Sequence, residues 1–354
     1  MDRTQGVVPG VKVVNVGGRL VPGSALSNFI FKLRIILRFR DLLTLDVVDA
    51  QYPVADGLPL MLLKLGGNRP AIVLRSVGKP LPNQIGLYLN YGGRSRIGFL
   101  LRKMSFRIRF ALNDLVLRHA DAGSYESLFM ARRMRNLESP LLRPVQLGID
   151  TSRYSWRAET DILRTFGILG KKYAIFVGAL EERKGAHVFV EAMLPLIREG
   201  ILDKALIIGK ERAHGYEAYL RKVIGEEASS FILANTLAPL ELIHLYSECA
   251  LFVSCSMDDS FGYPIVEAVA CGAPVVSTNV GVSYEIGLTP PIGIVGGFSA
   301  AETEEEARKI LSGANTTALR AARRQLVFPR FDLESWGRRL VDHYVQTIRS
   351  RYRQ

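Results

Sequence analysis

Two carboxylates flank a short turn in the second half of the chain, and their spacing points to a binding site. Asp259 precedes the turn from Ser260 to Tyr263, and Glu267 follows with seven residues between the two acids. Pro264 suits the first position of a helix, where its fixed φ is favourable and its missing N–H costs nothing. We expect a helix from Pro264 to Cys271, whose free N–H groups and positive end would attract an anion. The stretch therefore predicts an anion site.

The neighbouring segments would place this turn at the edge of a parallel sheet. Leu251 to Val253 is a short apolar run typical of a buried strand, and Ala273 to Ser277 is a second one after the helix stop at Gly272. A simpler interpretation of the acids stays open, in which Glu267 complements the helix dipole and Asp259 caps a turn. Residue type and spacing alone do not separate the two interpretations.

The stretch resembles the signature of glycosyltransferase family 4, in which a Glu, a Gly-Phe-Gly-x-Pro turn and a second Glu bind a nucleotide-sugar. Here Asp259 stands at the first Glu and Ser260 at the first Gly, while the segment from Glu267 to Glu285 follows the family closely. The resemblance implies that Lys184, Asp259 and Glu267 are catalytic. Lys184 and the amides after Asp259 would stabilise the leaving diphosphate. Asp259 would also hold sugar hydroxyls, and Glu267 the ribose hydroxyls.

Other segments of the second half would complete the donor site. The family has Gly-Arg-Leu and then Lys-Gly before a helix, and here Ala179 takes the Arg position, so that only Lys184 remains. A lysine at a helix entrance is otherwise an ordinary surface charge. Asn235 to Leu237 matches the family segment that reads the base through main-chain groups. The resemblance implies donor contacts from Gly178, Arg183, Lys184, Thr236, Leu237, Asp259, Ser260, Phe261, Gly262, Tyr263 and Glu267.

The order of apolar runs and helical patterns indicates an α/β protein, because strands alternate with helices in both halves. We expect strands at 11–16, 46–49, 71–74, near Ala122, and at 173–177, 205–208, 231–233 and 251–253, with helices at 27–40, 58–65, 186–197, 239–248 and 331–349. The resemblance implies a GT-B fold, in which two Rossmann-like domains face across a cleft. We place an acceptor domain at 1–150 and a nucleotide-sugar domain at 151–330, with the helix at 331–350 packing back on the first domain.

The first half departs from the family in two places. The strand that begins at Gly10 resembles the family's second strand, so we expect the first strand-helix unit to be missing and the natural product to start further upstream. Where the family places a His over the transferred sugar, this chain has Arg75 to Lys79. These two basic residues could face the leaving phosphate or an anionic acceptor, or be ordinary strand-end charges. A weakly active or inactive nucleotide-sugar-binding protein is therefore the alternative to an active transferase.

Positive charge is concentrated in the first half. The chain carries a net charge of +12, and residues 1–150 hold 22 Lys and Arg against 10 Asp and Glu. Two basic stretches, 31–40 and 94–118, interleave arginines with apolar residues and predict amphipathic helices that suit an anionic membrane surface. A solvated helix face is the ordinary alternative. We expect no nucleic-acid partner, because no recognition motif accompanies the charge.

Composition is that of a globular protein, with 354 residues of which 48% are hydrophobic. The three cysteines lack metal-ligand spacing, so we expect no metal site and a reduced cytoplasmic protein, with peripheral binding to the inner membrane face as an option. No cofactor is expected, since a UDP- or GDP-linked sugar would be the substrate. The resemblance implies retaining, metal-independent transfer to a lipid-linked or saccharide acceptor.

Overall fold

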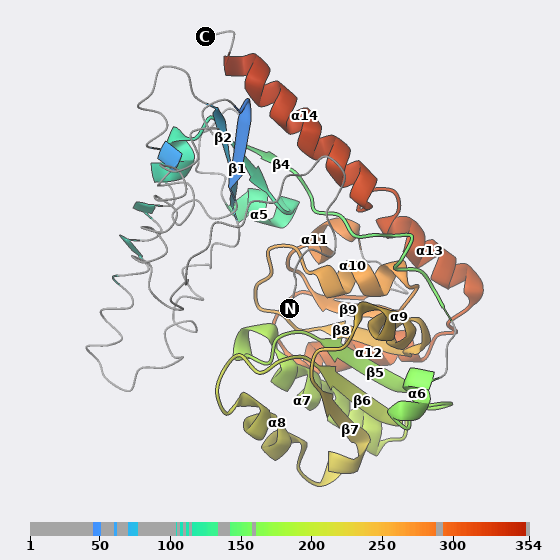
Figure 1. Ribbon diagram of the computed structural model, residues 1–354. Helices are drawn as coiled ribbons and strands as arrows, with labels where there is room; N and C mark the ends of the chain where they lie inside the picture. Colours follow the sequence, from blue (N-terminus) through green and yellow to red (C-terminus); the bar gives the residue numbers. More distant parts are fainter. Residues whose placement is uncertain are drawn as a thin grey trace, which may run out of the picture.

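The computed structural model describes residues 45–50, 60–61, 70–76, 104, 107–108, 111–112, 115–133, 142–157, 161–287 and 293–351. Its strands form two sheets, which lie in separate halves of the molecule (Figure 1). The predicted strand at 11–16, the predicted helix at 27–40, the missing first unit and Lys79 lie outside the described residues, as do most of the predicted helix at 58–65 and the basic stretch at 94–118.

Four described strands form the first sheet in sequential order: β1 (Val47–Ala50), β2 (Ala71–Ser76), β3 (Ala122–Tyr125) and β4 (Leu142–Pro144). Each neighbouring pair is parallel. β2 is buried from Ala71 to Leu74, as expected of a parallel strand that is covered on both faces. The strands predicted at 46–49, 71–74 and near Ala122 are confirmed to within two residues.

Six described strands form the second sheet, in the order β10-β9-β8-β5-β6-β7. From β5 the chain adds β6 and β7 on one side, and then returns to add β8, β9 and β10 on the other. This is the doubly wound Rossmann order, in which the direction of strand addition reverses between β5 and β8. The strands are β5 (Tyr173–Val177), β6 (Lys204–Ile208), β7 (Phe231–Ala234), β8 (Leu251–Ser254), β9 (Val275–Thr278) and β10 (Gly293–Val295).

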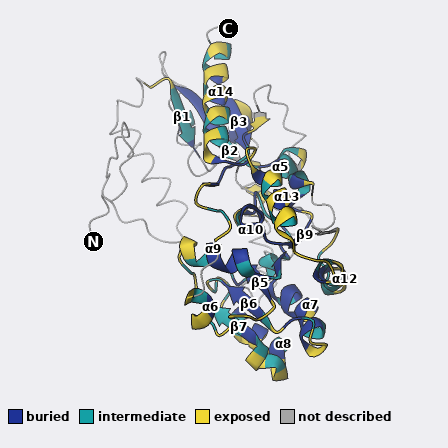
Figure 2. Cartoon of the chain, turned by 90° about the vertical axis from the view of Figure 1, so that its right-hand side faces the viewer, coloured by how far each residue is buried: buried dark blue, intermediate teal, exposed yellow. Residues whose placement is uncertain are grey.

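Helices cover both faces of this second sheet. Along β5, Ala174 and Phe176 enter one hydrophobic core with α7 (Ala186–Arg198), α8 (Tyr216–Ile224) and α12 (Ala300–Leu311). Tyr173 and Ile175 enter the other core with α9 (Pro239–Glu248) and α10 (Tyr263–Ala270). Successive side chains of a strand point to opposite faces, so one strand supports two cores. The buried strands lie between helices whose outer faces are exposed (Figure 2).

The last helix returns to the first sheet. After α13 (Thr317–Val327), helix α14 (Leu333–Arg351) runs beside β1 and β2 and contacts β2 (Figure 1). The Tyr344 hydroxyl donates a hydrogen bond to Asp49 in β1, and Arg339 Nη2 donates to the Gln146 carbonyl oxygen at 3.0 Å. The helix predicted at 331–349 is confirmed with a shift of two residues. No helix in the described ranges is long and apolar enough to cross a bilayer.

Candidate functional site

The site lies at the carboxyl ends of β5 and β8, where the strand order of the second sheet reverses. Ligands of doubly wound sheets bind at this switch point, because the loops after the two neighbouring strands diverge and leave a crevice. One loop leads from β5 through the short helix η4 (Glu182–Lys184) into α7, and the other leads from β8 to α10. Both loops carry residues that the sequence marks as candidates.

A glycine lets the two loops approach each other closely. Gly185 ends η4 with φ +76°, a left-handed conformation that glycine adopts without strain. A Cβ atom at this position would lie 2.0 Å from the carbonyl oxygen of Cys255 in the facing loop. Lys184 is thereby placed so that its Nζ lies 2.6 Å from Oδ2 of Asp259, and both side chains are largely shielded from solvent. The two residues form an ion pair.

This ion pair lines a cavity of about 440 Å³ between the two sheets. Residues of the second domain form one wall of the cavity, and residues of the first domain and α14 form the other. The lining residues are Arg75, Glu126, Leu147, Lys184, Asp259, Ser260, Phe261, Gly262, Tyr263, Pro264 and Trp336. The cavity therefore brings together Lys184, Asp259 and the whole predicted turn from Ser260 to Tyr263.

The turn presents the amino end of α10 to the cavity. Gly262 has φ +90° and precedes the helix, and Pro264 occupies its first turn, as predicted. Phe261 is buried and its carbonyl oxygen accepts a 2.6 Å hydrogen bond from Val282 N, which fixes the turn. The amide groups at such a helix start attract negative charge. Together with Lys184, this arrangement suits a phosphate group.

Five predicted donor residues lie outside the cavity lining, namely Glu267 and the four described here: Gly178, Arg183, Thr236 and Leu237. Arg183 forms a 2.5 Å ion pair with Glu181 and donates to the Asp258 carbonyl oxygen at 2.8 Å, so its guanidinium is engaged within the loop. Gly178 lies close to Lys184, since a Cβ atom at Gly178 would be 4.0 Å from the Lys184 Cβ. Thr236, which is exposed, and Leu237, which packs against the core, follow β7 further along the sheet edge.

The position of Glu267 does not fit the interpretation that it complements the helix dipole. It lies in the second turn of α10, and the first turn holds no acidic residue, so it does not complement the helix start. Its Oε2 accepts a hydrogen bond from the Tyr246 hydroxyl at 3.3 Å, and its carboxylate is also hydrogen-bonded to Tyr154. Burial raises its pKa, although these two hydrogen bonds lower it. The carboxylate is held in this way because α9 packs against α10 and brings Tyr246 to Glu267.

We expect Glu267→Gln to become more stable relative to the wild type as the pH rises from 4.5, the ordinary pKa of a glutamate, through the raised pKa of Glu267. A raised folded-state pKa means that the folded protein favours the protonated carboxyl, so the wild type loses stability as pH rises through the raised value. The amide has no such loss. Thermal unfolding at several pH values measures the difference. As a control, Glu199→Gln should show no such trend over this range, because the hydrogen bond with Arg308 lowers the pKa of the exposed Glu199 and its titration therefore lies below pH 4.5. A difference independent of pH would contradict the prediction for Glu267.

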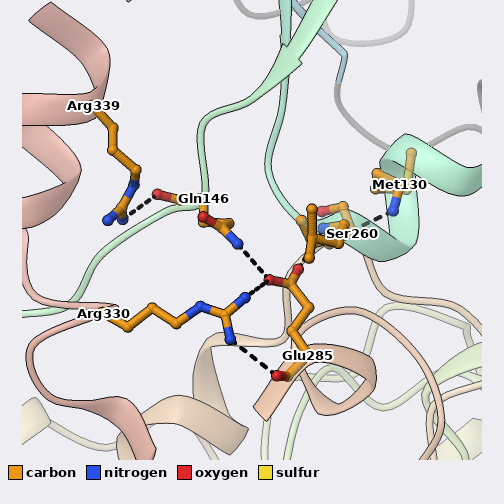
Figure 3. Close-up of polar contacts among 8 residues, drawn as sticks. Met130, Gln146, Ser260, Glu285, Arg330 and Arg339 are labelled. Carbon is orange, nitrogen blue, oxygen red and sulfur yellow. Dashed lines mark hydrogen bonds and ion pairs between the residues drawn. The ribbon is translucent and has the colours of Figure 1, made fainter. Parts of the chain in front are cut away.

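A second carboxylate, Glu285, connects the two domains and had no role in the sequence prediction beyond ending the motif. It lies in the short helix α11 (Ser283–Ile286), and its side chain is completely buried. Its Oε1 accepts a hydrogen bond from Leu128 N at the start of α5 (Leu128–Arg133), and its Oε2 accepts one from Gln146 Nε2 at 2.7 Å. Arg330 Nη2 lies 3.1 Å from the same Oε2 (Figure 3). Such contacts between distant segments leave no local sequence pattern.

Glu126 is the other residue that sequence reasoning missed. It follows β3 directly and lines the cavity opposite Asp259, and its carboxylate is hydrogen-bonded to Ser260. The neighbouring Ser127 Oγ also donates to the Ser260 carbonyl oxygen, at 2.6 Å. Its position directly after a strand was the available signal, because the carboxyl ends of parallel strands line ligand sites.

Comparison with known sequences agrees with this geometry. Residues 171–312 match the family model described as "Glycosyl transferases group 1". A D-inositol 3-phosphate glycosyltransferase from Corynebacterium jeikeium is 34% identical over 168 residues, which cover 45% of this chain and 38% of that protein. An O-antigen chain mannosyltransferase B from Escherichia coli is 30% identical over 120 residues, covering 34% of this chain and 32% of that protein. The matched segments thus span about a third of the length of these curated relatives.

Solved structures match over almost the whole chain. Sucrose-phosphate synthase from Thermosynechococcus elongatus superposes with a TM-score of 0.73 at 17% identity, covering 92% of this chain and 79% of that one. Anabaena HepE in complex with UDP gives a TM-score of 0.71 at 15% identity, covering 90% and 82%. At this level of identity the similarity concerns the fold, which is the predicted GT-B arrangement of two Rossmann-like domains. The match to the group 1 glycosyltransferases is therefore confined to residues 171–312 of the second domain, while the GT-B fold extends over nearly the whole chain.

Proposed function

We propose that this protein transfers a sugar from a nucleotide-sugar donor to a hydroxyl group of a saccharide or lipid-linked acceptor. The observation that carries the proposal is the ion pair of Lys184 and Asp259 beside the amino end of α10, in a cavity at the switch point. A cation and a row of amides suit a diphosphate, and a carboxylate beside that cation suits the hydroxyl groups of the attached sugar. The HepE complex with UDP has the same fold with a nucleotide bound.

In the proposed mechanism, the hydroxyl oxygen of the acceptor bonds to the anomeric carbon as the bond from that carbon to the diphosphate oxygen breaks, and the hydroxyl proton passes to the departing diphosphate. Charge develops on the departing diphosphate, and Lys184 and the amides after Asp259 stabilise it. Before this step, binding of the donor breaks the Lys184–Asp259 ion pair, because the lysine then contacts the phosphate groups and the aspartate contacts the sugar hydroxyls. Retention of configuration and transfer without a metal ion are parts of the proposal that rest on the family resemblance.

We expect Lys184→Ala to weaken binding of the donor by about 1.5–3 kcal/mol, the range for a hydrogen bond to a charged group. The free energy is measured by calorimetric titration with UDP-glucose and with GDP-mannose, which also identifies the preferred base. Lys210→Ala is the matched control, because Lys210 is an exposed lysine that follows β6 in the same domain. Equal affinities of the wild type and Lys184→Ala would remove Lys184 from the donor site.

Ala179 favours a second candidate function, a nucleotide-sugar-binding protein with little or no transfer. The arginine expected at this position would have shared the diphosphate charge with Lys184, and Arg183 is engaged by Glu181 instead. A turnover assay with saccharide and lipid-linked acceptors separates the two functions, since both predict binding of the donor and only the first predicts product.

Association with an anionic membrane surface is a further part of the proposal. Within the described part of the basic stretch, Met104, Ile108 and Leu115 are exposed apolar residues, and Arg107 and Arg118 are exposed beside them. Their spacing of four and seven residues places the apolar groups on one face of a helix. This combination of apolar and basic groups suits acidic lipid headgroups.

A further inference from the structure

The wall of the cavity that faces the donor residues is built by the first domain and α14. Arg75 ends β2, Glu126 follows β3, Leu147 lies in the connection after β4, and Trp336 comes from α14. If the second domain holds the donor, as proposed above, this wall faces the sugar and is where an acceptor would lie. The charges on the wall therefore bear on which acceptors the cavity admits.

The positive charge of Arg75 on this wall is balanced by an ion pair with Asp49. Arg75 contacts Asp49 Oδ2 through both Nε at 2.9 Å and Nη2 at 2.6 Å, and both side chains are largely buried. The Tyr344 hydroxyl approaches the same carboxylate and the same guanidinium, and the Trp336 ring lies 5.7 Å from the guanidinium carbon. These contacts engage Nε and Nη2, and Asp49 balances the charge of Arg75, which weakens its attraction for a phosphate group. Arg75 therefore does not by itself make this wall an anion site.

Glu126 is the other charged residue of the wall built by the first domain and α14. Its carboxylate is hydrogen-bonded to Ser260, and among the described residues no lysine or arginine forms an ion pair with it. Burial raises its pKa, as does the nearby charge of Asp259, whereas the hydrogen bond with Ser260 and the charge of Arg75 lower it. A carboxylate accepts about four hydrogen bonds, so most of the capacity of Glu126 is left for a ligand that donates hydrogen bonds.

We infer that Glu126 accepts a hydrogen bond from a hydroxyl group of the acceptor, and that the acceptor is uncharged where it meets this wall, as in a sugar or another polyol. The inference rests on the proposed function, since it needs the donor on the opposite wall. Glu126 attracts hydroxyl hydrogens and repels a phosphate at the same place, because like charges brought together across an interface disfavour binding. The residue thus selects the acceptor and takes no proton in the reaction.

The test compares initial rates of the full chain and Glu126→Gln, with methyl hexosides and their 6-phosphates as acceptors. We expect the wild type to prefer the uncharged hexosides. In Glu126→Gln the KM for the uncharged hexosides should rise about tenfold, in the range for loss of a hydrogen bond to a charged group. The ratio of kcat/KM for the uncharged hexosides to kcat/KM for the 6-phosphates should fall, and the Kd for the donor should stay within about twofold of the wild-type value. The control is Glu334→Gln, which changes an exposed carboxylate of α14 outside the cavity lining.

The outcomes separate this inference from the proposed function. If the wild type binds no nucleotide-sugar in calorimetry, the proposed function fails and the inference fails with it. If the wild type transfers only to the 6-phosphates, or prefers them, the inference alone is wrong, whereas a donor that binds with no transfer to any acceptor counts against the proposed transfer and the inference together. An unchanged acceptor KM in a folded Glu126→Gln overturns it too. Should that variant unfold, Glu126→Asp takes its place. The shorter side chain keeps the negative charge but withdraws the carboxylate from the cavity, and the same rise in the acceptor KM is expected.

Discussion

Replacing Glu285 with alanine should lower the midpoint of thermal unfolding by about 6–12 °C. Removing one partner of a buried charged pair costs about 3–5 kcal/mol, and Arg330 is partly exposed, so we expect the lower end, about 3 kcal/mol. One kcal/mol shifts the midpoint by roughly 2–4 °C in a domain of this size. The loss arises because Leu128 N and Gln146 Nε2 keep their partly buried positions without an acceptor. Figure 3 shows the Gln146 side chain directed at the Glu285 carboxylate.

The same change should loosen the contact between the two domains. Glu285 belongs to the second domain, Leu128 starts a helix of the first domain, and Arg330 precedes the returning helix α14, so one carboxylate holds three segments. We expect small-angle scattering to report a larger radius of gyration for Glu285→Ala. The control is Glu334→Ala, which removes an exposed pair with Arg338 within α14 and should change stability by less than about 0.5 kcal/mol. A midpoint and a radius equal to those of the wild type would contradict the connecting role of Glu285.

The second domain could be predicted from sequence because its strands are buried on both faces and therefore appear as unbroken apolar runs. β6, with the sequence KALII, and β8, with the sequence LFVS, are examples, and their predicted bounds agree within one residue. Helix α9 was predicted residue for residue, because Pro239 marks its start. The turn before α10 was recognisable for the same reason.

The candidate site was less predictable, because its contacts join residues that are far apart in the sequence. Lys184 and Asp259 were assigned to different parts of the donor, and the structure brings their side chains into one ion pair. Glu126 follows a short strand, AGSY, that is no run of large apolar residues, and it belongs to no recognisable motif. Glu267 has the expected spacing from Asp259, but which side chains surround it depends on how α9 packs against α10, and no local pattern records that packing.

Replacing Gly185 with alanine should lower the free energy of unfolding by about 2–5 kcal/mol, because two separate costs add at this residue. A positive φ at a residue other than glycine costs about 1–2 kcal/mol. The added Cβ would also lie 2.0 Å from the Cys255 carbonyl oxygen, and relieving that overlap costs about a further 1–3 kcal/mol. Denaturant unfolding of the variant measures the sum of the two costs.

Gly200→Ala separates the two contributions. Gly200 has φ +72°, close to the +76° of Gly185, but no atom lies within 4 Å of a Cβ built there. The control should therefore lose only the stability that corresponds to the backbone strain, about 1–2 kcal/mol.

The overlap at Gly185 can be relieved only by moving η4 away from the loop after β8, and that movement carries Lys184 away from Asp259. Gly185→Ala should accordingly lose about tenfold in donor affinity, while Gly200→Ala keeps it. Equal losses of stability in the two variants, with donor affinity unchanged in both, would show that the close approach of the loops does not position Lys184.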